Sequence, residues 1–252
     1  MDAGDVLTRP AARPDAVLRY GGHADHLLDL HLPPTTHAPA PVVFLLHGGF
    51  WRQEYDRTHT RPVAHALAAD GWAVVTPEYR RTGGDGGRPQ TFDDVAAAFA
   101  HLGAVHDVAP DRLLPDEVTL LGHSAGGHLA MWLALGADRP VAPRIRRVVA
   151  LAPVADLREA HRRRLGDGAV GALMGGAPDA LPKEYAEADA ASRLPADLDI
   201  TVVHGDRDRQ VPVDLSRRLP GVSYVELPGV DHHALIDPLS SAWPAVVAAL
   251  AC

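Results

Sequence analysis

The stretch Val118–Leu129, VTLLGHSAGGHL, joins an apolar strand to a helix through a glycine-flanked serine. Its centre, residues 122–126, fits the pattern G-x-S-x-G with Ser124 in the middle position. Such a turn holds the serine in a strained backbone conformation and lifts its hydroxyl above a parallel sheet. Small flanking residues are needed because a Cβ there would crowd the neighbouring strand or helix. The stretch therefore predicts a nucleophile elbow, with Ser124 as the nucleophile.

Strand and helix patterns alternate along the rest of the chain. Runs that indicate strands are Ala16–Tyr20, His26–Leu32, Val42–Leu46, Trp72–Thr76, Val118–Leu121, Ile145–Leu151, Ile200–His204 and Ser223–Leu227. Helical patterns occupy Thr58–Asp70, residues 91–102, Ala125–Leu135 and Ala242–Leu250. Alternation with short links predicts an α/β fold with a doubly wound, mostly parallel sheet, formed by one domain over residues 1–252. Residues 157–194 break the pattern, and we expect a small insertion with two short helical pieces over the carboxyl edge of the sheet.

Composition narrows the class of protein. The chain has 252 residues and a formal net charge of −8, which argues against nucleic acid as its main partner. No stretch approaches 18 apolar residues, and residues 1–22 lack an apolar signal-peptide core, so we expect neither a membrane span nor a secretory signal. The lone Cys252 allows no intrachain disulfide, which fits a reducing cytoplasm. A small-molecule substrate is the expected partner, and a homodimer is left open.

Motifs for cofactors and metals are missing from the sequence. No dinucleotide-binding G-x-G-x-x-G follows a strand, no phosphate-binding loop is present, and no H-E-x-x-H spacing occurs. We therefore expect a protein that works without a cofactor or a metal ion.

A serine hydroxyl needs a base within hydrogen-bond reach and a group that orients that base. On a doubly wound sheet these groups follow later strands, in the chain order serine, acid, histidine. The chain has that order, because HGDRDRQVP at His204–Pro212 and PGVDHHALIDP at Pro228–Pro238 follow the last two predicted strands.

These stretches, together with HGGFW at His47–Trp51, resemble the α/β-hydrolase superfamily. The chain is most similar to its branch of small esterases and arylformamidases (kynurenine formamidase-like enzymes). ALMGGAPDALP at Ala172–Pro182 also resembles the insertion of that branch, and the resemblance runs from about Val17 to Leu250. It implies an α/β-hydrolase fold and a serine hydrolase with a Ser-His-Asp triad.

The resemblance also suggests roles for particular residues. In the family pattern H-G-x-x-D-x-x-V-P the carboxylate takes the fifth position, which is Asp208, while Asp206 is the alternative in the same loop. His232 is the expected general base. The family usually has an apolar or aromatic residue after its histidine, whereas this chain has His233, which is therefore a second candidate base and otherwise a pocket-wall residue.

The HGGFW stretch follows a buried strand at the place where this fold builds part of its oxyanion hole. We expect the N–H of Ala125 and that of Gly49 or Phe50 to hold the developing oxyanion, and the helix that Ala125 opens adds its positive end. Phe50 and Trp51 fit two interpretations equally, as core aromatics or as walls of the substrate pocket.

The sequence thus predicts a serine hydrolase that cleaves small carboxylic esters through an acyl-enzyme. An arylformamidase acting on N-formylkynurenine-like formyl amides is the main alternative, because HGGFW resembles the HGGYW-type sequence of arylformamidases. Two further readings are less favoured: a peptidase, for which no gating domain is present, and a hydrolase-fold protein that binds a ligand without catalysis.

Overall fold

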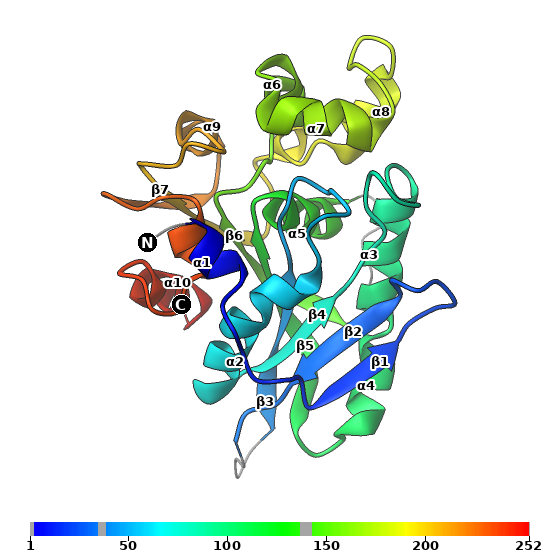
Figure 1. Cartoon of the computed structure of the whole chain (residues 1–252), viewed down its shortest axis with the longest axis vertical. Helices are drawn as coiled ribbons and strands as arrows, with labels where there is room; N and C mark the ends of the chain where they lie inside the picture. The colour runs from blue at the N-terminus through cyan, green and yellow to red at the C-terminus, as the bar shows by residue number, and fades with distance from the viewer. Residues whose placement is uncertain (1–2, 35–38, 137–142, 252) are drawn as a thin grey trace.

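The computed structural model describes residues 3–34, 39–136 and 143–251 (Figure 1). Eight strands form one sheet in the order β1-β2-β4-β3-β5-β6-β7-β8. The pairs β1–β2 and β2–β4 are antiparallel, and the other neighbours are parallel. The strands are β1 (Ala16–Arg19), β2 (Leu27–His31), β3 (Ala40–Leu46), β4 (Ala73–Pro77), β5 (Leu113–His123), β6 (Arg144–Leu151), β7 (Asp199–Gly205) and β8 (Ser223–Leu227).

Helices cover both faces of this sheet. The helices of the described residues are α1 (Ala3–Leu7), η1 (Arg57–Thr60), α2 (Arg61–Ala69), α3 (Gln90–Ala100), α4 (Leu102–Val108), α5 (Ala125–Leu135), α6 (Leu157–Arg162), α7 (Leu165–Met174), α8 (Pro182–Ala188), η2 (Ala191–Arg193), α9 (Asp214–Arg217), η3 (His233–Ile236) and α10 (Trp243–Ala251). One hydrophobic core lies between the sheet and α3, α4 and α5, and a second lies between the sheet and α2 and α10.

Successive side chains of the central strands pack alternately into these two cores. In β3, Val42, Phe44 and Leu46 belong to the core on the α5 side, whereas Val43 and Leu45 belong to the core on the α2 side. Because successive side chains of a strand point to opposite faces, a strand covered on both sides needs a continuous apolar run. This confirms the predicted mostly parallel, doubly wound sheet.

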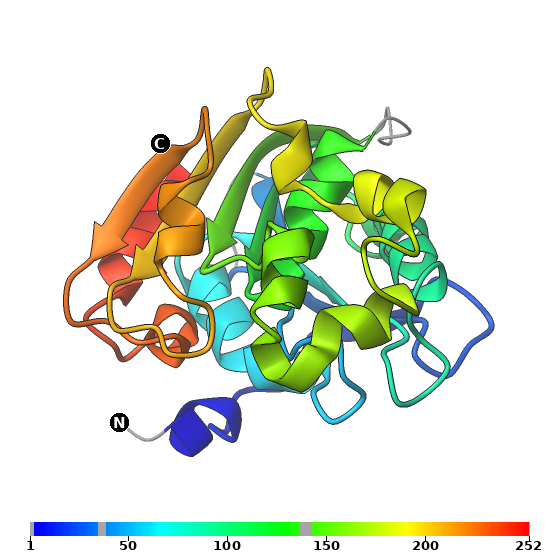
Figure 2. The same cartoon turned by 90° about the horizontal axis from the view of Figure 1, so that it is seen from above.

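The predicted insertion lies beyond the carboxyl ends of the parallel strands, where Figures 1 and 2 show α6, α7 and α8 grouped together. It contains three α-helices and η2, more than the two helical pieces expected. The backbone of α7 contains a kink, with left-handed φ angles of 55°, 52° and 84° at Gly166, Asp167 and Gly168. Such a kink interrupts the 3.6-residue spacing of apolar residues by which a helix is predicted from sequence.

Other boundaries differ in ways that have a local cause. The predicted helix over residues 91–102 is divided in two, because α3 ends at Ala100 and the separate helix α4 begins at Leu102. Strand β5 begins at Leu113, five residues before the predicted start, and its register against β3 shifts between Pro41 and Val42. That irregularity interrupts the apolar pattern, so the first part of the strand carries no sequence signal. The short helices α1 and α9 were not predicted either.

Candidate active site

The turn between β5 and α5 carries Ser124 with φ 56° and ψ −117°, as the glycine-flanked motif predicts. The Ser124 N–H donates a hydrogen bond to the carbonyl of Leu151 at 2.8 Å, which fixes the turn against β6. A Cβ on Gly122 would lie 2.2 Å from the carbonyl oxygen of Gly126, and one on Gly126 would lie 2.1 Å from that of Leu46. Backbone occupies both positions, so only glycine fits there.

His232 and Asp208 meet although they follow different strands. The distance from His232 Nδ1 to Asp208 Oδ2 is 2.5 Å, and both side chains are buried. Asp208 Oδ1 accepts two further hydrogen bonds, both at 2.8 Å, from the N–H groups of Gln210 and Val211. Burial alone would raise the pKa of Asp208, but hydrogen bonds from His204 and His232 hold this pKa well below its ordinary range. The carboxylate is therefore ionised and aimed at the imidazole.

The alternative residues have other partners. Asp206 accepts a hydrogen bond from the N–H of Gly229 at 2.6 Å, in an exposed turn. Both ring nitrogens of His233 lie 3.4 to 3.5 Å from the side-chain amide of Gln210. Burial, followed by the charge of His232, lowers the pKa of His233 to about 4. Of the candidate acids and bases in the sequence, Asp208 and His232 are thus the two in contact.

The HGGFW loop turns sharply beside Ser124. Three successive residues have positive φ: Gly49 at 109°, Phe50 at 50° and Trp51 at 55°. A Cβ on Gly49 would lie 2.3 Å from Cβ of Tyr55, so this position admits only glycine. Gly49 and Phe50 line the same pocket as Ser124. The backbone of this loop and the first turn of α5, which begins at Ala125, therefore flank the predicted nucleophile, as expected for oxyanion donors.

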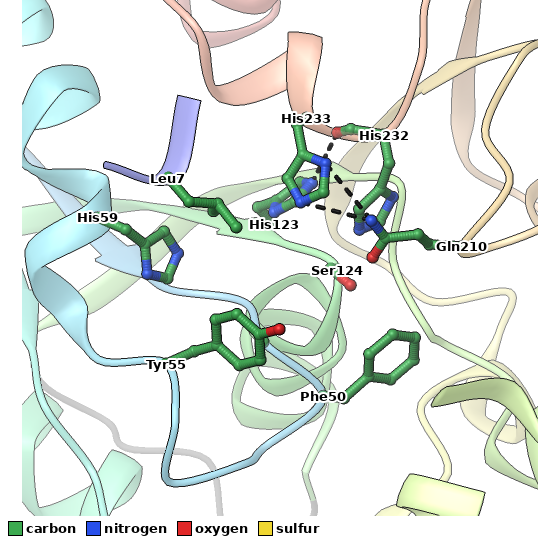
Figure 3. A pocket seen from close by; sticks show the side chains of 10 residues that line it. Leu7, Phe50, Tyr55, His59, His123, Ser124, Gln210, His232 and His233 are labelled. Atoms are coloured by element: carbon green, nitrogen blue, oxygen red, sulfur yellow. Dashed lines mark hydrogen bonds between the residues drawn. The ribbon is translucent and has the colours of Figure 1, made fainter. Parts of the chain in front are cut away.

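The pocket has a cavity volume of about 230 Å³ and contains residues from five separate parts of the chain (Figure 3). It is lined by Leu7, Gly49, Phe50, Tyr55, His59, His123, Ser124, Gln210, His232 and His233. The proposed pocket-wall role of His233 agrees with this position. The sequence analysis assigns no role to Leu7, Tyr55 or His59, whereas Gln210 lies inside the HGDRDRQVP stretch and could have been noticed there.

Trp51 is not among these lining residues. Its side chain is fully buried and packs edge-on against His128, with 5.3 Å between the ring centroids. With the positive φ values of the loop, the side chain of Trp51 lies in the core while Phe50 lines the pocket. Of the two interpretations for this aromatic, the core position is the one the structure has.

A buried charge cluster lies behind the HGGFW loop. His47 Nε2 lies 2.9 Å from Glu78 Oε1, and Glu78 Oε2 accepts the N–H of Arg57 at 3.0 Å. Arg81 also donates to Glu78 at 2.5 Å, and the hydroxyl of Tyr79 donates to the carbonyl of His47 at 2.7 Å. These contacts fix the start of the loop to β4 and η1.

Two negative findings concern the described residues only. Among residues 3–34, 39–136 and 143–251, no three or more histidine, cysteine, aspartate or glutamate side chains are grouped so that they could hold a metal ion. In the same part of the chain, every helix is too short or too polar to cross a bilayer.

The fold is that of the α/β-hydrolase class. Superposition on a structure of esterase B from Lactobacillus rhamnosis with a tributyrin phosphonate gives a TM-score of 0.76 at 23% identity, covering 98% of this chain and 86% of that one. The particular family follows from the sequence. The chain belongs to the BD-FAE family, whose model matches residues 28–221.

Two named relatives add to this picture. The probable carboxylic ester hydrolase LipM of Mycobacterium tuberculosis is 30% identical over 257 residues, covering 90% of this chain and 57% of LipM. A kynurenine formamidase of Drosophila melanogaster is 31% identical over 147 residues, covering 56% of this chain and 46% of that enzyme. The chain therefore spans about half the length of these curated relatives.

Proposed function

We propose that the protein is a serine hydrolase that cleaves small carboxylic esters through an acyl-enzyme. The observation that carries the proposal is the hydrogen bond between Asp208 and His232 at the pocket that Ser124 lines. The similarity to the carboxylic ester hydrolase LipM supports the same activity.

In the proposed mechanism, Ser124 Oγ attacks the carbonyl carbon of the ester while His232 Nε2 takes the hydroxyl proton. The oxyanion accepts hydrogen bonds from the N–H of Ala125 and from that of Gly49 or Phe50. Collapse of this intermediate breaks the ester bond, and His232 returns the proton to the departing alcohol. A water molecule then repeats the sequence on the acyl-enzyme and releases the acid. Asp208 holds the Nδ1–H of the imidazole and stabilises its charged form.

Matched variants test these roles. Ser124→Ala should lower kcat for a p-nitrophenyl ester by more than about 10³-fold, because the nucleophile is lost. Asp208→Asn should cost about 10⁴-fold, whereas Asp206→Asn should stay close to wild type because Asp206 binds only the Gly229 turn. Labelling by a fluorophosphonate, followed by peptide mass spectrometry, should find the adduct on Ser124.

Two results would contradict the proposal. Ser124→Ala with nearly full esterase activity would refute the mechanism. Failure of the wild-type protein to react with fluorophosphonate would instead favour a ligand-binding protein with a hydrolase fold.

A third measurement concerns the peptidase alternative. Peptide amides left intact beside rapidly cleaved acetyl esters would argue against a peptidase.

An arylformamidase is the second candidate function. It is supported by the HGGFW stretch and by the similarity to the kynurenine formamidase of Drosophila melanogaster. Comparing kcat/KM for N-formylkynurenine with kcat/KM for short p-nitrophenyl esters decides between the two substrate classes, and we expect the esters to be preferred.

We further propose that residues 1–252 act as a single domain in the cytoplasm. The single cysteine of the sequence is compatible with that reducing compartment. A homodimer is the assembly to test. Light scattering coupled to size-exclusion chromatography measures the mass in solution, and a mass equal to that of one chain would refute the homodimer.

A further inference from the structure

The helix α1 reaches the pocket through Leu7, a contribution that the HGGFW, GHSAGG and histidine motifs do not suggest. We propose that α1 closes the acyl end of the pocket and that Leu7 limits the length of the acyl group that the protein accepts. This inference rests on the proposed ester-hydrolase function and adds a specificity-determining residue to it.

The helix is fixed in place by contacts on several sides. Val6 is 5% exposed and belongs to the core shared with α2 and α10. The helix contacts both η1, which carries His59, and η3, which begins at His233. Just beyond it, Arg9 Nη2 lies 3.0 Å from Asp237 Oδ2, whose side chain is 1% exposed. Leu7 can therefore limit the size of the pocket, because displacing this segment would break the core contacts of Val6 and the ion pair of Arg9 together.

The position of the base decides which end of the pocket holds the acyl group. The oxygen of the leaving alcohol must lie within hydrogen-bond reach of His232, which returns the proton to it. His232 and Gln210 lie on one side of Ser124 in Figure 3, and Gln210 also contacts His233. The alcohol therefore occupies that side. Figure 3 shows Leu7, Tyr55 and His59 on the other side of Ser124. The acyl chain therefore extends towards Leu7.

The chemistry of this end suits an uncharged acyl group. Burial, followed by the charge of His47, lowers the pKa of His59 to about 4, so His59 is neutral at physiological pH. The side chain of Tyr55 packs against Gly49 and presents its ring to the pocket. Leu7, which lies beside His59 in Figure 3, adds an apolar surface to this end. No charged side chain is among the residues lining the described pocket, apart from histidines.

The size of the pocket points to short acyl chains. Its cavity volume of about 230 Å³ lies below the roughly 300–1,000 Å³ of sites for drug-sized ligands. Replacing leucine by alanine removes three carbon atoms from this wall. The space gained should accommodate an acyl chain about two to three carbons longer, because each added methylene can then be buried where a removed carbon lay.

The test compares kcat/KM of wild type and Leu7→Ala across two ester series. One series lengthens the acyl chain from acetyl to decanoyl on p-nitrophenol, and the other lengthens the alcohol of acetate esters. We expect Leu7→Ala to raise the octanoyl-to-acetyl ratio of kcat/KM by about 10-fold or more and to leave the alcohol series unchanged. Leu7→Phe should lower the ratio. Leu239→Ala, at a leucine that is 71% exposed, is the matched control and should keep the wild-type profile.

The outcomes separate this inference from the function on which it rests. An unchanged acyl profile in both Leu7 variants, with folding verified by circular dichroism, overturns the inference. A change confined to the alcohol series overturns the acyl assignment. If the wild-type protein turns over none of the esters, or if Ser124→Ala turns them over equally well, the proposed function is overturned instead.

Discussion

At the scale of single residues, His123 links the predicted nucleophile to the predicted base. It occupies the first variable position of G-x-S-x-G, and its Nε2 lies 3.0 Å from the carbonyl oxygen of His232. Burial, followed by the charge of His232, lowers the pKa of His123 well below 6.5. The neutral ring can therefore donate an N–H to that carbonyl and hold the backbone of His232 in position.

We predict that His123→Ala lowers kcat by about 10- to 100-fold, in the range found when a group that orients a functional side chain is removed. KM should change less than kcat, because the hydrogen bond of the ring goes to the backbone of His232. Steady-state kinetics with a p-nitrophenyl ester measures both quantities.

His128 provides the matched control. It is another buried histidine, and its Nε2 lies 2.9 Å from a backbone carbonyl, that of Ala188, away from the pocket lining. His128→Ala should lower the stability and keep kcat. Equal loss of kcat in both variants would show that His123 has only a structural effect.

The sequence predicts the residues of the candidate site whose positions depend on local turns. Ser124 follows from its glycine-flanked turn, and Asp208 and His232 follow from short motifs after strands. No role could be predicted for Leu7, Tyr55 and His59, because they approach Ser124 only through the tertiary packing of α1, of the loop after β3 and of η1. Trp51 shows the same limit, since its side-chain direction depends on three successive positive φ angles.

At the scale of elements, the insertion supports the HGGFW loop. The guanidinium of Arg52 donates to the carbonyl of Gly166 in α7. A Cβ on Gly166 would lie 2.7 Å from the ring of Phe50, so the kinked backbone of α7 lies directly against this aromatic side chain. A predicted oxyanion donor is thus packed beneath the insertion.

We predict that Gly166→Ala lowers kcat/KM by about 10- to 100-fold, because a small displacement of Phe50 moves its N–H away from the reacting oxygen. Gly168→Ala is the control. Gly168 also has a left-handed φ, of 84°, but a Cβ there meets no atom within 4 Å.

Both variants should lose about 1 kcal/mol of unfolding free energy from backbone strain, measured by urea denaturation. Only Gly166→Ala should lose activity. Similar kcat/KM values in the two variants would count against a role for the Phe50 contact.

The elements that the sequence predicts well are those with strong patterns. β3, β4, β6 and β7 are apolar because both of their faces are covered, and α5 is apolar on nearly every side for the same reason. The first part of β5, the break between α3 and α4, and the kinked α7 depend on register shifts and on backbone turns, which leave no periodic signal.

At the scale of the whole molecule, Glu78 and Asp29 connect several elements through buried ion pairs. Asp29 in β2 accepts hydrogen bonds from Arg57 at 2.9 Å and from Arg61 at 2.8 Å. Arg57 also contacts Glu78, which follows β4. Burial alone would raise the pKa of Glu78, but His47 and Arg81 lower it from 4.5 to about 2.

We predict that Glu78→Gln lowers the unfolding free energy at neutral pH by about 3 kcal/mol, because the buried cations lose their counter-charge. The pKa of Glu78 is lower in the folded than in the unfolded protein, so its contribution is present above about pH 4.5 and is lost as the pH falls towards about 2. The difference between wild type and variant should therefore shrink over that range. Urea denaturation at a series of pH values measures it, and a constant difference would contradict the assignment.

The ion pair between Arg9 and Asp237 joins residues 228 positions apart in the chain. Bringing such distant segments together has an entropy cost that local contacts do not repay. We therefore expect the wall that contains Leu7 to form after the central strands have ordered α5 and the loops around it. We expect a refolding molecule to pass through a stage in which the nucleophile is already in place but the cleft is still open on one side. Selectivity for the substrate would then be acquired later than reactivity.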